Sequence, residues 1–215
     1  MLFNLTPELL IANLFALGLG MTVHEFAHNY VGWRMGDPEP ARLGRLTLNP
    51  LVHINWIGWL MFAVLGFGIL GSAPISPYRM PAENRRWRWL AAVAAGPFAN
   101  LLIAILFALF VRLVGFQGVA GLPDLLAIII LQTISLNILL FVFNLLPLFP
   151  IDGWHIVYAL LPPDFATWWQ RNQRITTYIF FGLLLLSFVP LAGISPLRLL
   201  IGEPTQLIFR FLIGL

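Results

Sequence analysis

The chain has 215 residues, of which 60% are apolar and only 10% are charged. Long apolar runs with few charges are typical of a protein that crosses a membrane several times. The absence of cysteine excludes disulfides, thiolate metal sites and cysteine nucleophiles. The net charge of +3 comes from twelve arginines and nine acids, with no lysine. Because the arginines fall in short segments between apolar runs, they indicate membrane topology and not nucleic-acid binding.

Hydropathy along the chain predicts several helical spans and one domain. In chain order, the spans cover residues 7–33, 54–70, 88–112, 125–148, 174–193 and, weakly, 196–214. This pattern predicts an all-α polytopic membrane protein with about five to six transmembrane or re-entrant segments. A short β element is an option in the loops between the first and third spans. No repeat or long polar stretch could form a second domain, so residues 1–215 are predicted to form a single integral membrane domain.

Span 54–70 is predicted to be re-entrant or to lie on the membrane surface. It is short for a full crossing and is flanked by Gly66, Gly68, Gly71, Pro74 and Pro77. Nine of the twelve arginines also fall on one side of the membrane, provided that the chain makes an even number of crossings between residues 34 and 88. The last span carries charged residues and is expected at the membrane interface.

The first span carries a metal-binding motif near its end, His24-Glu25-Phe26-Ala27-His28. The span lacks a basic leader and a cleavage site, so it is predicted to stay in the mature protein. Residues four apart share one helix face, so His24 and His28 can direct ring nitrogens to one Zn²⁺, with Glu25 beside a metal-bound water as general base. A charged group costs about 2.5 to 3.5 kcal/mol at the bilayer centre. A metal ion would compensate these groups.

Asp152 is the predicted third ligand. A catalytic zinc site uses three protein ligands and leaves one position open. Asp152 follows span 125–148, at the end that the arginine pattern places level with His24 and His28. Asp124 stands at the opposite end of the same span, displaced by most of the bilayer thickness.

The stretch leading to this aspartate is Asn144-Leu-Leu-Pro147-Leu-Phe-Pro150-Ile-Asp152-Gly153. Pro147 and Pro150 prevent a regular helix from continuing, which leaves irregular backbone where an unwound substrate could lie. Asn144 could hold a substrate carbonyl or stabilise a developing oxyanion.

These motifs resemble those of the site-2 protease family of intramembrane zinc metalloproteases. The similarity rests on the His24 to His28 motif and on Asn144-x-x-Pro147-x-x-Pro150-Ile151-Asp152-Gly153. Two further stretches are similar to family segments. Residues 94–100 resemble a Gly-x-x-x-Asn stretch that opens the intervening helix, and residues 44–54 resemble a segment of the compact branch without a PDZ domain.

The resemblance implies one metalloprotease domain with half-sites near residues 24–28 and 144–153. One Zn²⁺ per chain would be bound by His24, His28 and Asp152. Glu25 would activate water, and Asn144 would position the substrate. His53 is a candidate for a gate or for a residue that supports the metal site.

The resemblance also implies an endopeptidase that cuts in or near the transmembrane segments of membrane-anchored proteins, as in regulated intramembrane proteolysis. The expected partners are a transmembrane protein substrate and membrane lipids, with no nucleic acid, and the oligomeric state is unknown from sequence. The expected location is the cell membrane, as a multi-pass protein whose active site faces the arginine-rich, cytoplasmic side.

Other interpretations of the motif stay open from sequence alone. One is a non-catalytic zinc-dependent membrane scaffold or a metal-handling transporter. Glu25 argues against a scaffold because a structural zinc site needs no general base. Another is a second class of helical membrane zinc peptidase, whose third ligand is a distant glutamate, which here would be Glu203.

Overall fold

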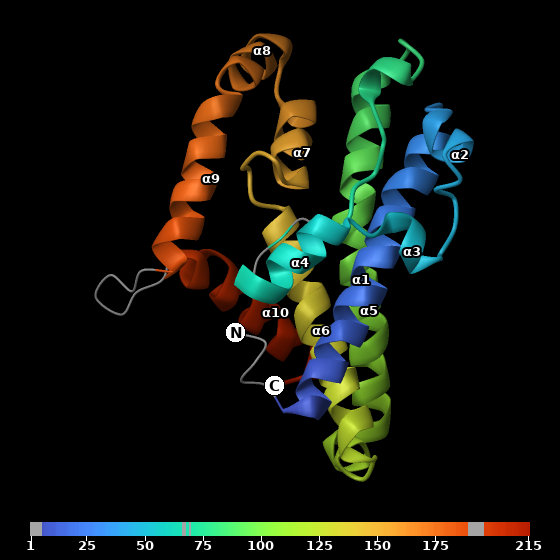
Figure 1. Cartoon of the computed structure of the whole chain (residues 1–215), viewed down its shortest axis with the longest axis vertical. Helices are drawn as coiled ribbons and strands as arrows, with labels where there is room; N and C mark the ends of the chain where they lie inside the picture. The colour runs from blue at the N-terminus through green and yellow to red at the C-terminus, as the bar shows by residue number, and fades with distance from the viewer. Residues whose placement is uncertain (1–5, 66–67, 69, 189–195) are drawn as a thin grey trace.

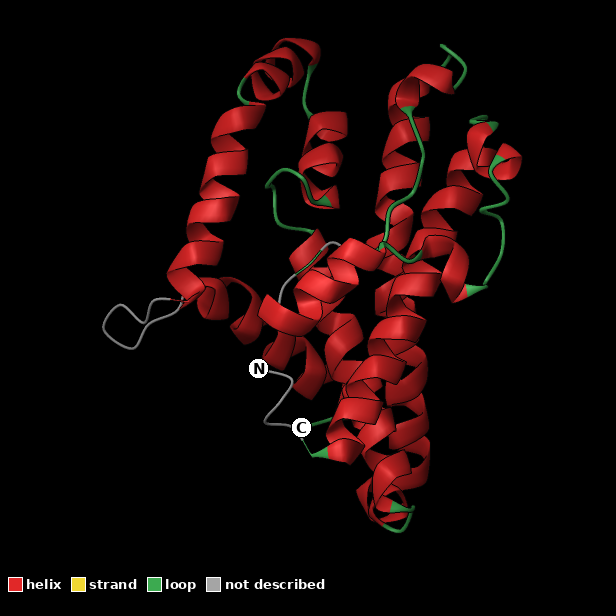
Figure 2. Cartoon of the chain, viewed as in Figure 1, coloured by secondary structure: helices red, strands yellow, loops and turns green. Residues whose placement is uncertain are grey.

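Three long helices form the centre of the computed structural model, which describes residues 6–65, 68, 70–188 and 196–215. These helices are α1 (Pro7–Arg34), α5 (Arg85–Ala120) and α6 (Asp124–Asn144), and each is long and apolar enough to cross a membrane. They pack against one another as a bundle (Figure 1). The described ranges contain helices and loops but no β-strand (Figure 2). The predicted class, an all-α membrane protein, is confirmed.

Shorter helices surround this bundle. In chain order they are α2 (Glu39–Arg42), α3 (Pro50–His53), α4 (Trp56–Leu65), the 3₁₀ turn η2 (Pro77–Arg79), α7 (Asp152–Leu160), α8 (Pro163–Arg171), α9 (Gln173–Phe188), the π-helical turn η3 (Arg198–Gly202) and α10 (Glu203–Ile213). The predicted spans 54–70, 174–193 and 196–214 therefore correspond to helices shorter than the three central ones, and residues 189–193 lie outside the described ranges. The assignment of residues 1–215 to one domain stays a prediction.

Local sequence signals explain where the central helices begin and end. Thr6 precedes α1, and its hydroxyl accepts a hydrogen bond from the Leu9 N–H at 3.3 Å, while Pro7 takes the first helical position. Helix α5 is longer than the predicted span 88–112, because its arginine-rich first turn is already helical and it continues through a kink at Gly115, where φ is +75°. Helix α6 ends at Asn144, ahead of Pro147.

Small residues bring the central helices close together. A Cβ at Gly20 of α1 would lie 2.7 Å from Asn137 Oδ1 on α6, so only glycine allows this approach. Further along the bundle, α5 and α6 share a core that includes Ala104, Ala108, Ile134 and Ile138. Close packing of this kind sets the spacing of the helices that carry the motifs.

Helix α10 contributes to that core. Ile213 is buried in the cluster formed by α5 and α6, and Arg112 of α5 donates hydrogen bonds to the last carbonyls of α10, those of Phe211 and Leu212. A guanidinium group satisfies carbonyls that a helix end leaves unpaired. The expected interface helix therefore packs one side against the bundle.

The segment predicted to be re-entrant leaves the bundle and returns to it. Helix α4 has 10 residues, about 15 Å, which is half of the ~30 Å hydrocarbon core. Ile54 and Gly71 form an antiparallel bridge, and the Asn55 N–H donates to the Leu70 carbonyl at 2.9 Å. The two ends of the segment thus lie side by side. Within the described residues, this single bridge is all that remains of the expected β element.

Most of the arginine-bearing segments gather at one end of the molecule, whereas Arg112 and Arg210 lie toward the other. The C-terminal end of α1, the N-terminal end of α5 and helix α8 lie at the top of the view in Figure 1. This arrangement agrees with the even number of crossings between residues 34 and 88 that the arginine pattern predicts. The multi-pass arrangement in the cell membrane and the side that this end faces stay predictions.

Single-cysteine labelling tests this topology cleanly because the chain has no native cysteine. Leu48 and Tyr78 are exposed and lie before and after segment 54–70 in the sequence, whereas Asp124 is exposed at the opposite end of the bundle. We expect Leu48→Cys and Tyr78→Cys to react with an impermeant maleimide from one side of oriented vesicles, and Asp124→Cys from the other. Labelling of residues 48 and 78 from opposite sides would contradict the return of the chain.

Candidate metal centre

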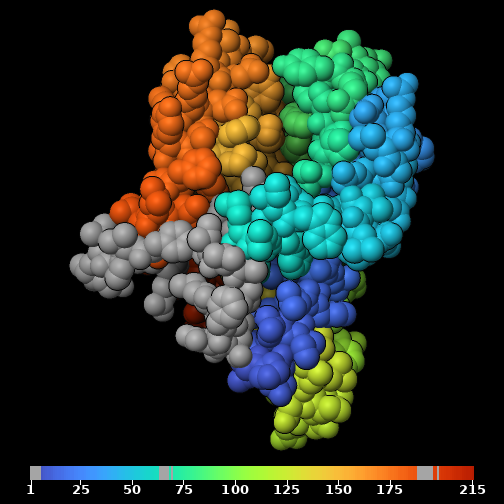
Figure 3. All heavy atoms as spheres, viewed as in Figure 1, coloured from blue at the N-terminus to red at the C-terminus, as the bar shows by residue number. Residues whose placement is uncertain are grey.

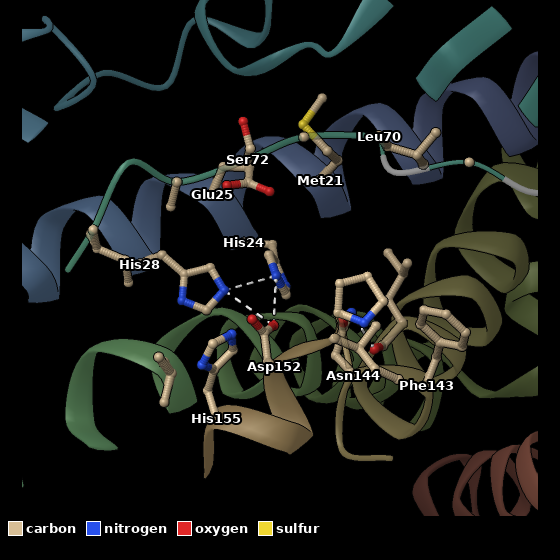
Figure 4. A pocket seen from close by; sticks show the side chains of 18 of the residues that line it. Met21, His24, Glu25, His28, Leu70, Ser72, Phe143, Asn144, Asp152 and His155 are labelled. Carbon is tan, nitrogen blue, oxygen red and sulfur yellow. Dashed lines mark hydrogen bonds and ion pairs between the residues drawn. The ribbon is translucent and has the colours of Figure 1, made fainter. Parts of the chain in front are cut away.

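Two histidines of α1 and the first residue of α7 converge on one point. His24 Nε2 and His28 Nε2 are 2.9 Å apart, and each lies 3.2 Å from Asp152 Oδ2. The histidines are one helical turn apart, and the aspartate comes from the turn that follows α6 (Figure 4). Their candidate ligand atoms all lie within 4.8 Å of one another. The structure thus brings together the three residues that the sequence predicted as ligands.

A chain of buried amides fixes the orientation of His24. Its Nδ1 donates to Asn100 Oδ1 at 2.7 Å, and Asn100 Nδ2 donates to the Gly20 carbonyl at 3.0 Å and to Asn137 Oδ1 at 2.9 Å. Asn137 Nδ2 donates in turn to the Thr133 carbonyl at 2.9 Å. A backbone carbonyl can only accept, so it fixes the orientation of each amide and places the His24 proton on Nδ1.

His28 is held in the same way by a backbone group. Its Nδ1 lies 2.8 Å from the Ala92 carbonyl of α5, to which it donates. Both histidines therefore carry their proton on Nδ1 when neutral, and both turn an Nε2 lone pair toward Asp152.

The convergence of these atoms fits a bound cation. Two Nε2 lone pairs and a carboxylate oxygen are all acceptors, and three acceptors facing one another repel unless a positive charge lies between them. Ligands of a tetrahedral zinc ion with bonds of about 2.0 to 2.1 Å lie roughly 3.3 Å apart, close to the separations seen here. Gly96 adds a steric requirement, because a Cβ there would lie 2.2 Å from His28 Nε2 and 2.7 Å from His24 Nε2.

Glu25 lies beside this group without belonging to it. Its side chain is buried, and its Oε2 has no hydrogen-bond partner among the described residues. Glu25 and the three ligands line one cavity of ≈ 370 Å³, whose walls come from α1, α5, α6, the turn before α7, and the chain that follows α4. Figure 4 places Glu25 on the side of the cavity away from Asp152. A water molecule in the cavity could reach this carboxylate.

An extended stretch, residues 70–76, closes the Glu25 side of the cavity, and we call it the strap. Ser72 of the strap is seen next to Glu25 in Figure 4, and Leu70 lies further along, beyond Met21. A Cβ at Gly71 would lie 2.6 Å from Glu25 Oε1, so glycine allows the strap to touch the carboxylate. Among the described residues, the backbone groups of Ala73 make no hydrogen bond, whereas the bridge between Ile54 and Gly71 turns those of Ser72 toward the chain before α4. The strap therefore presents an open edge beside the site.

An ion pair between the buried Asp37 and the exposed Arg79 anchors the far end of the strap. Asp37 is 0% exposed and accepts two hydrogen bonds from Arg79, at 2.7 and 2.8 Å, and one from the Ser76 N–H at 2.8 Å. Arg79 also donates to the Pro74 carbonyl at 2.5 Å. Burial alone would raise the pKa of Asp37. The hydrogen bonds from Arg79 and from the backbone N–H groups of Glu39 and Ser76 outweigh burial and hold that pKa below its ordinary value.

Asn144 and His155 also line the cavity. One N–H of the Asn144 amide donates to the Leu140 carbonyl at 2.9 Å, which leaves its second N–H available. His155 lies between the rings of Trp89 and Trp154, and this burial lowers its pKa, although the Asp152 charge acts in the opposite direction. The role of Asn144 toward a substrate stays a prediction.

His53 lies apart from the ligand group. It is 1% exposed, its Nε2 donates to the Thr47 carbonyl at 2.8 Å, and it does not line the cavity. Its Nδ1 has no partner among the described residues. The suggestion that His53 gates or supports the metal site stays a prediction.

Sequence reasoning did not find the part played by Asn100. The family-like stretch 94–100 was expected to open a helix, but it lies well inside α5, which begins at Arg85. Asn100 orients His24 from there. The Gly-x-x-x-Asn pattern was a usable signal, because it places Gly96 and Asn100 on one face of the helix. The Ala92 carbonyl left no signal, since any residue supplies a backbone carbonyl.

The fold and the site define an all-α membrane protein with a candidate zinc centre, and known proteins agree. The chain is 35% identical to "Putative zinc metalloprotease YwhC" of Bacillus subtilis, over 88% of this chain and 84% of that protein. It is 30% identical to "Putative zinc metalloprotease Rip2" of Mycolicibacterium smegmatis over 68% of this chain, and 32% identical to Rip2 of Mycobacterium tuberculosis over 71%. The matches span only 56% and 57% of the two Rip2 proteins. No family model matches the chain, and no solved structure matches it significantly. The chain belongs to the site-2 protease family of zinc metalloproteases.

Replacement of Gly96 tests the cradle around the ligands. We expect Gly96→Ala to weaken zinc binding by about 10- to 100-fold, because the new methyl group would overlap both Nε2 atoms. Gly18→Ala is the matched control, since a Cβ at this α1 glycine meets nothing within 4 Å. Zinc content after dialysis against a graded chelator measures the effect. Equal zinc retention in the two variants would contradict the assignment.

The Asp37 ion pair should make stability depend on pH. We expect Asp37→Asn to lower the free energy of unfolding by about 1 to 2 kcal/mol at neutral pH, because the neutral amide weakens the charge-assisted hydrogen bonds that Asp37 accepts, while the exposed Arg79 side chain keeps its contact with solvent. Since the folded-state pKa of Asp37 lies below its ordinary value of about 3.9, this advantage of the wild type is fully present above about pH 4. It is lost as the pH falls through the folded-state pKa.

Thermal unfolding in detergent between pH 3 and 7 measures this difference. At each pH, the free energy of unfolding of the variant is subtracted from that of the wild type. This difference removes the effect of acid on the metal site, which both proteins share. Glu83→Gln removes an exposed carboxylate nearby and serves as control. A wild-type advantage that stays constant across the whole pH range would contradict the role of Asp37.

Proposed function

We propose that the protein is an intramembrane zinc endopeptidase that hydrolyses peptide bonds in or near the transmembrane segments of membrane-anchored proteins. The observation that carries the proposal is the buried Glu25 carboxylate, whose Oε2 has no partner among the described residues and which shares a cavity with the three candidate ligands. A structural zinc site is closed and needs no general base. A carboxylate kept beside an open metal position suits a hydrolase.

His24, His28 and Asp152 would hold one Zn²⁺ per chain. When bound in such a site, zinc lowers the pKa of its water to about 7 and polarises a carbonyl. Glu25 would accept the proton of the attacking water and then deliver it to the leaving nitrogen of the cut peptide bond. The buried amides that orient His24 would keep the ligand nitrogens in place throughout.

The strap suggests how the substrate is presented. Peptide bonds in a transmembrane helix are protected by their own hydrogen bonds, so a substrate has to unwind before attack. The open backbone edge at Ala73 could pair with the unwound strand and hold it beside Glu25. The free N–H of Asn144, in the same cavity, could then hold a substrate carbonyl or its oxyanion.

The proposed setting follows from the same features. Three helices able to cross a membrane support a multi-pass protein of the cell membrane, and the proposed substrates are membrane-anchored regulators. The arginine-rich end of the molecule is proposed to face the cytoplasm.

The decisive experiment separates metal binding from catalysis in membranes that contain single-span reporter substrates. We expect Glu25→Gln to keep its zinc and to lose activity by at least about 10²-fold, because the general base is gone. Asp152→Ala should lose both zinc and activity, whereas Asp164→Asn, which alters an exposed acid of α8, should lose neither. Cleavage by Glu25→Gln at the wild-type rate would overturn the proposal.

A further inference from the structure

A second cavity lies at the arginine-rich end of the molecule, between the start of α5 and the pair α7 and α8. Its volume is ≈ 650 Å³, and it appears as the hollow between the green and orange segments at the top of Figure 3. It is lined by four residues of the loop before α5 (Pro77, Tyr78, Ala82 and Asn84), by the first turn of α5, by the end of α7, and by Pro163, Ala166 and Thr167 of α8. It has one residue, Trp89, in common with the metal-site cavity. None of the proposed catalytic residues reaches it. The functions of the two cavities can therefore be tested separately.

Two arginines of this cavity are held rigidly but are not neutralised. Arg85 Nε donates to the Met80 carbonyl at 3.3 Å, and Arg86 Nε donates to the Ala159 carbonyl at the end of α7. The Arg86 guanidinium also lies 5.6 Å from the centre of the Trp87 ring. These contacts use the Nε atoms, and no hydrogen bond from an Nη group of Arg85 or Arg86 is found within the described ranges.

No lining residue supplies an acidic counterpart to the positive charge of the cavity, and the nearby acids Glu83 and Asp164 are exposed and do not line it. The lining contains no aspartate or glutamate, and none of the ion pairs among the described residues involves Arg85 or Arg86. The residues outside the described ranges carry no acidic side chain either. Arginine does not lose its proton in proteins. Two fixed guanidinium groups in one partly enclosed cavity therefore favour an anionic ligand from outside the chain.

The position of the cavity identifies the class of anion. Arg85 begins the longest of the three helices able to cross a membrane, and residues 89–111 of that helix carry no charge, so a membrane around them would place the cavity at its boundary. Tyr78 and Trp87 line the same cavity and are 73% and 58% exposed, as aromatic residues are at the level of lipid headgroups. Phosphate is the anion found at the level of lipid headgroups. The planar guanidinium group of arginine can donate two parallel hydrogen bonds to phosphate oxygens.

We propose that this cavity binds the phosphate group of an anionic phospholipid, with Arg85 and Arg86 as the recognition residues. The size of the cavity suits a headgroup, since small-molecule sites commonly measure about 300 to 1,000 Å³. Arg86 joins the start of α5 to the end of α7, the helix that begins with Asp152. The lipid thereby occupies the side of α7 remote from the proposed catalytic group.

The test measures lipid binding by native mass spectrometry on delipidated, zinc-loaded protein. Phosphatidylglycerol, phosphatidylcholine and inorganic phosphate are the three probes. The test variant is Arg85→Gln with Arg86→Gln. The control is Arg171→Gln with Arg174→Gln, which removes the same charge from two exposed arginines at the same end of the molecule. Zinc content reports whether each variant remains folded.

We expect the wild type and the control to prefer phosphatidylglycerol to phosphatidylcholine, and the test variant to lose about thirtyfold in affinity for phosphatidylglycerol. If the test variant loses its zinc, the double variant Arg85→Lys with Arg86→Lys replaces it, because lysine keeps the positive charge but lacks the planar guanidinium group. We then expect this variant to bind phosphatidylglycerol more weakly than the control does. Equal loss in test and control variants would show a general charge effect and overturn the proposal. Binding of inorganic phosphate without preference between the lipids would assign the cavity to a soluble phosphate compound and also overturn it.

Discussion

The mutual repulsion of three acceptor atoms is the constraint on which the rest of this structure depends. His24 Nε2, His28 Nε2 and Asp152 Oδ2 lie within hydrogen-bonding distance of one another, and in an apolar bundle this convergence is tolerated only around a positive charge. The hydrogen bonds behind the ring nitrogens enforce it, because each Nδ1 is committed to an oxygen on α5. Helix α5 thus decides which nitrogens face the metal, although it supplies no ligand itself.

This arrangement requires unusually close contact between helices, and glycine provides it. Gly96 leaves the space that the two imidazole rings occupy, Gly20 lets α6 reach Asn100 through Asn137, and Gly71 lets the strap touch Glu25. At each of these positions a single added carbon would meet a polar atom of the site at 2.7 Å or less. Helix packing in membranes uses small residues for the same reason. These three glycines therefore shape the metal site, although they supply no ligand to it.

The sequence predicted those features that depend on distance along one element. The spacing of His24 and His28 follows from the helix period, and the depth of Asp152 follows from span length and the arginine pattern. The return of segment 54–70 also followed from its length. The contacts of His24 with Asn100 and of His28 with Ala92 could not be predicted this way. They depend on the rotation of α5 about its own axis, and a helix that is apolar on all sides gives no pattern from which to predict that rotation.

The ion pair between Asp37 and Arg79 shows a related limit, because its partners are 42 residues apart and lie in loops, where no period connects them. This ion pair nonetheless affects the candidate metal centre, because it positions the strap beside Glu25. It fixes one end of the strap while the bridge between Ile54 and Gly71 fixes the other. The strap is thus held between two fixed ends, with the backbone groups of Ala73 unpaired within the described structure. Non-helical backbone in a membrane protein persists only where it is buried in protein or meets water. An open edge beside Glu25 therefore requires a wet cavity, so the geometry that would offer a proposed substrate strand its partner would also admit the water that hydrolysis consumes.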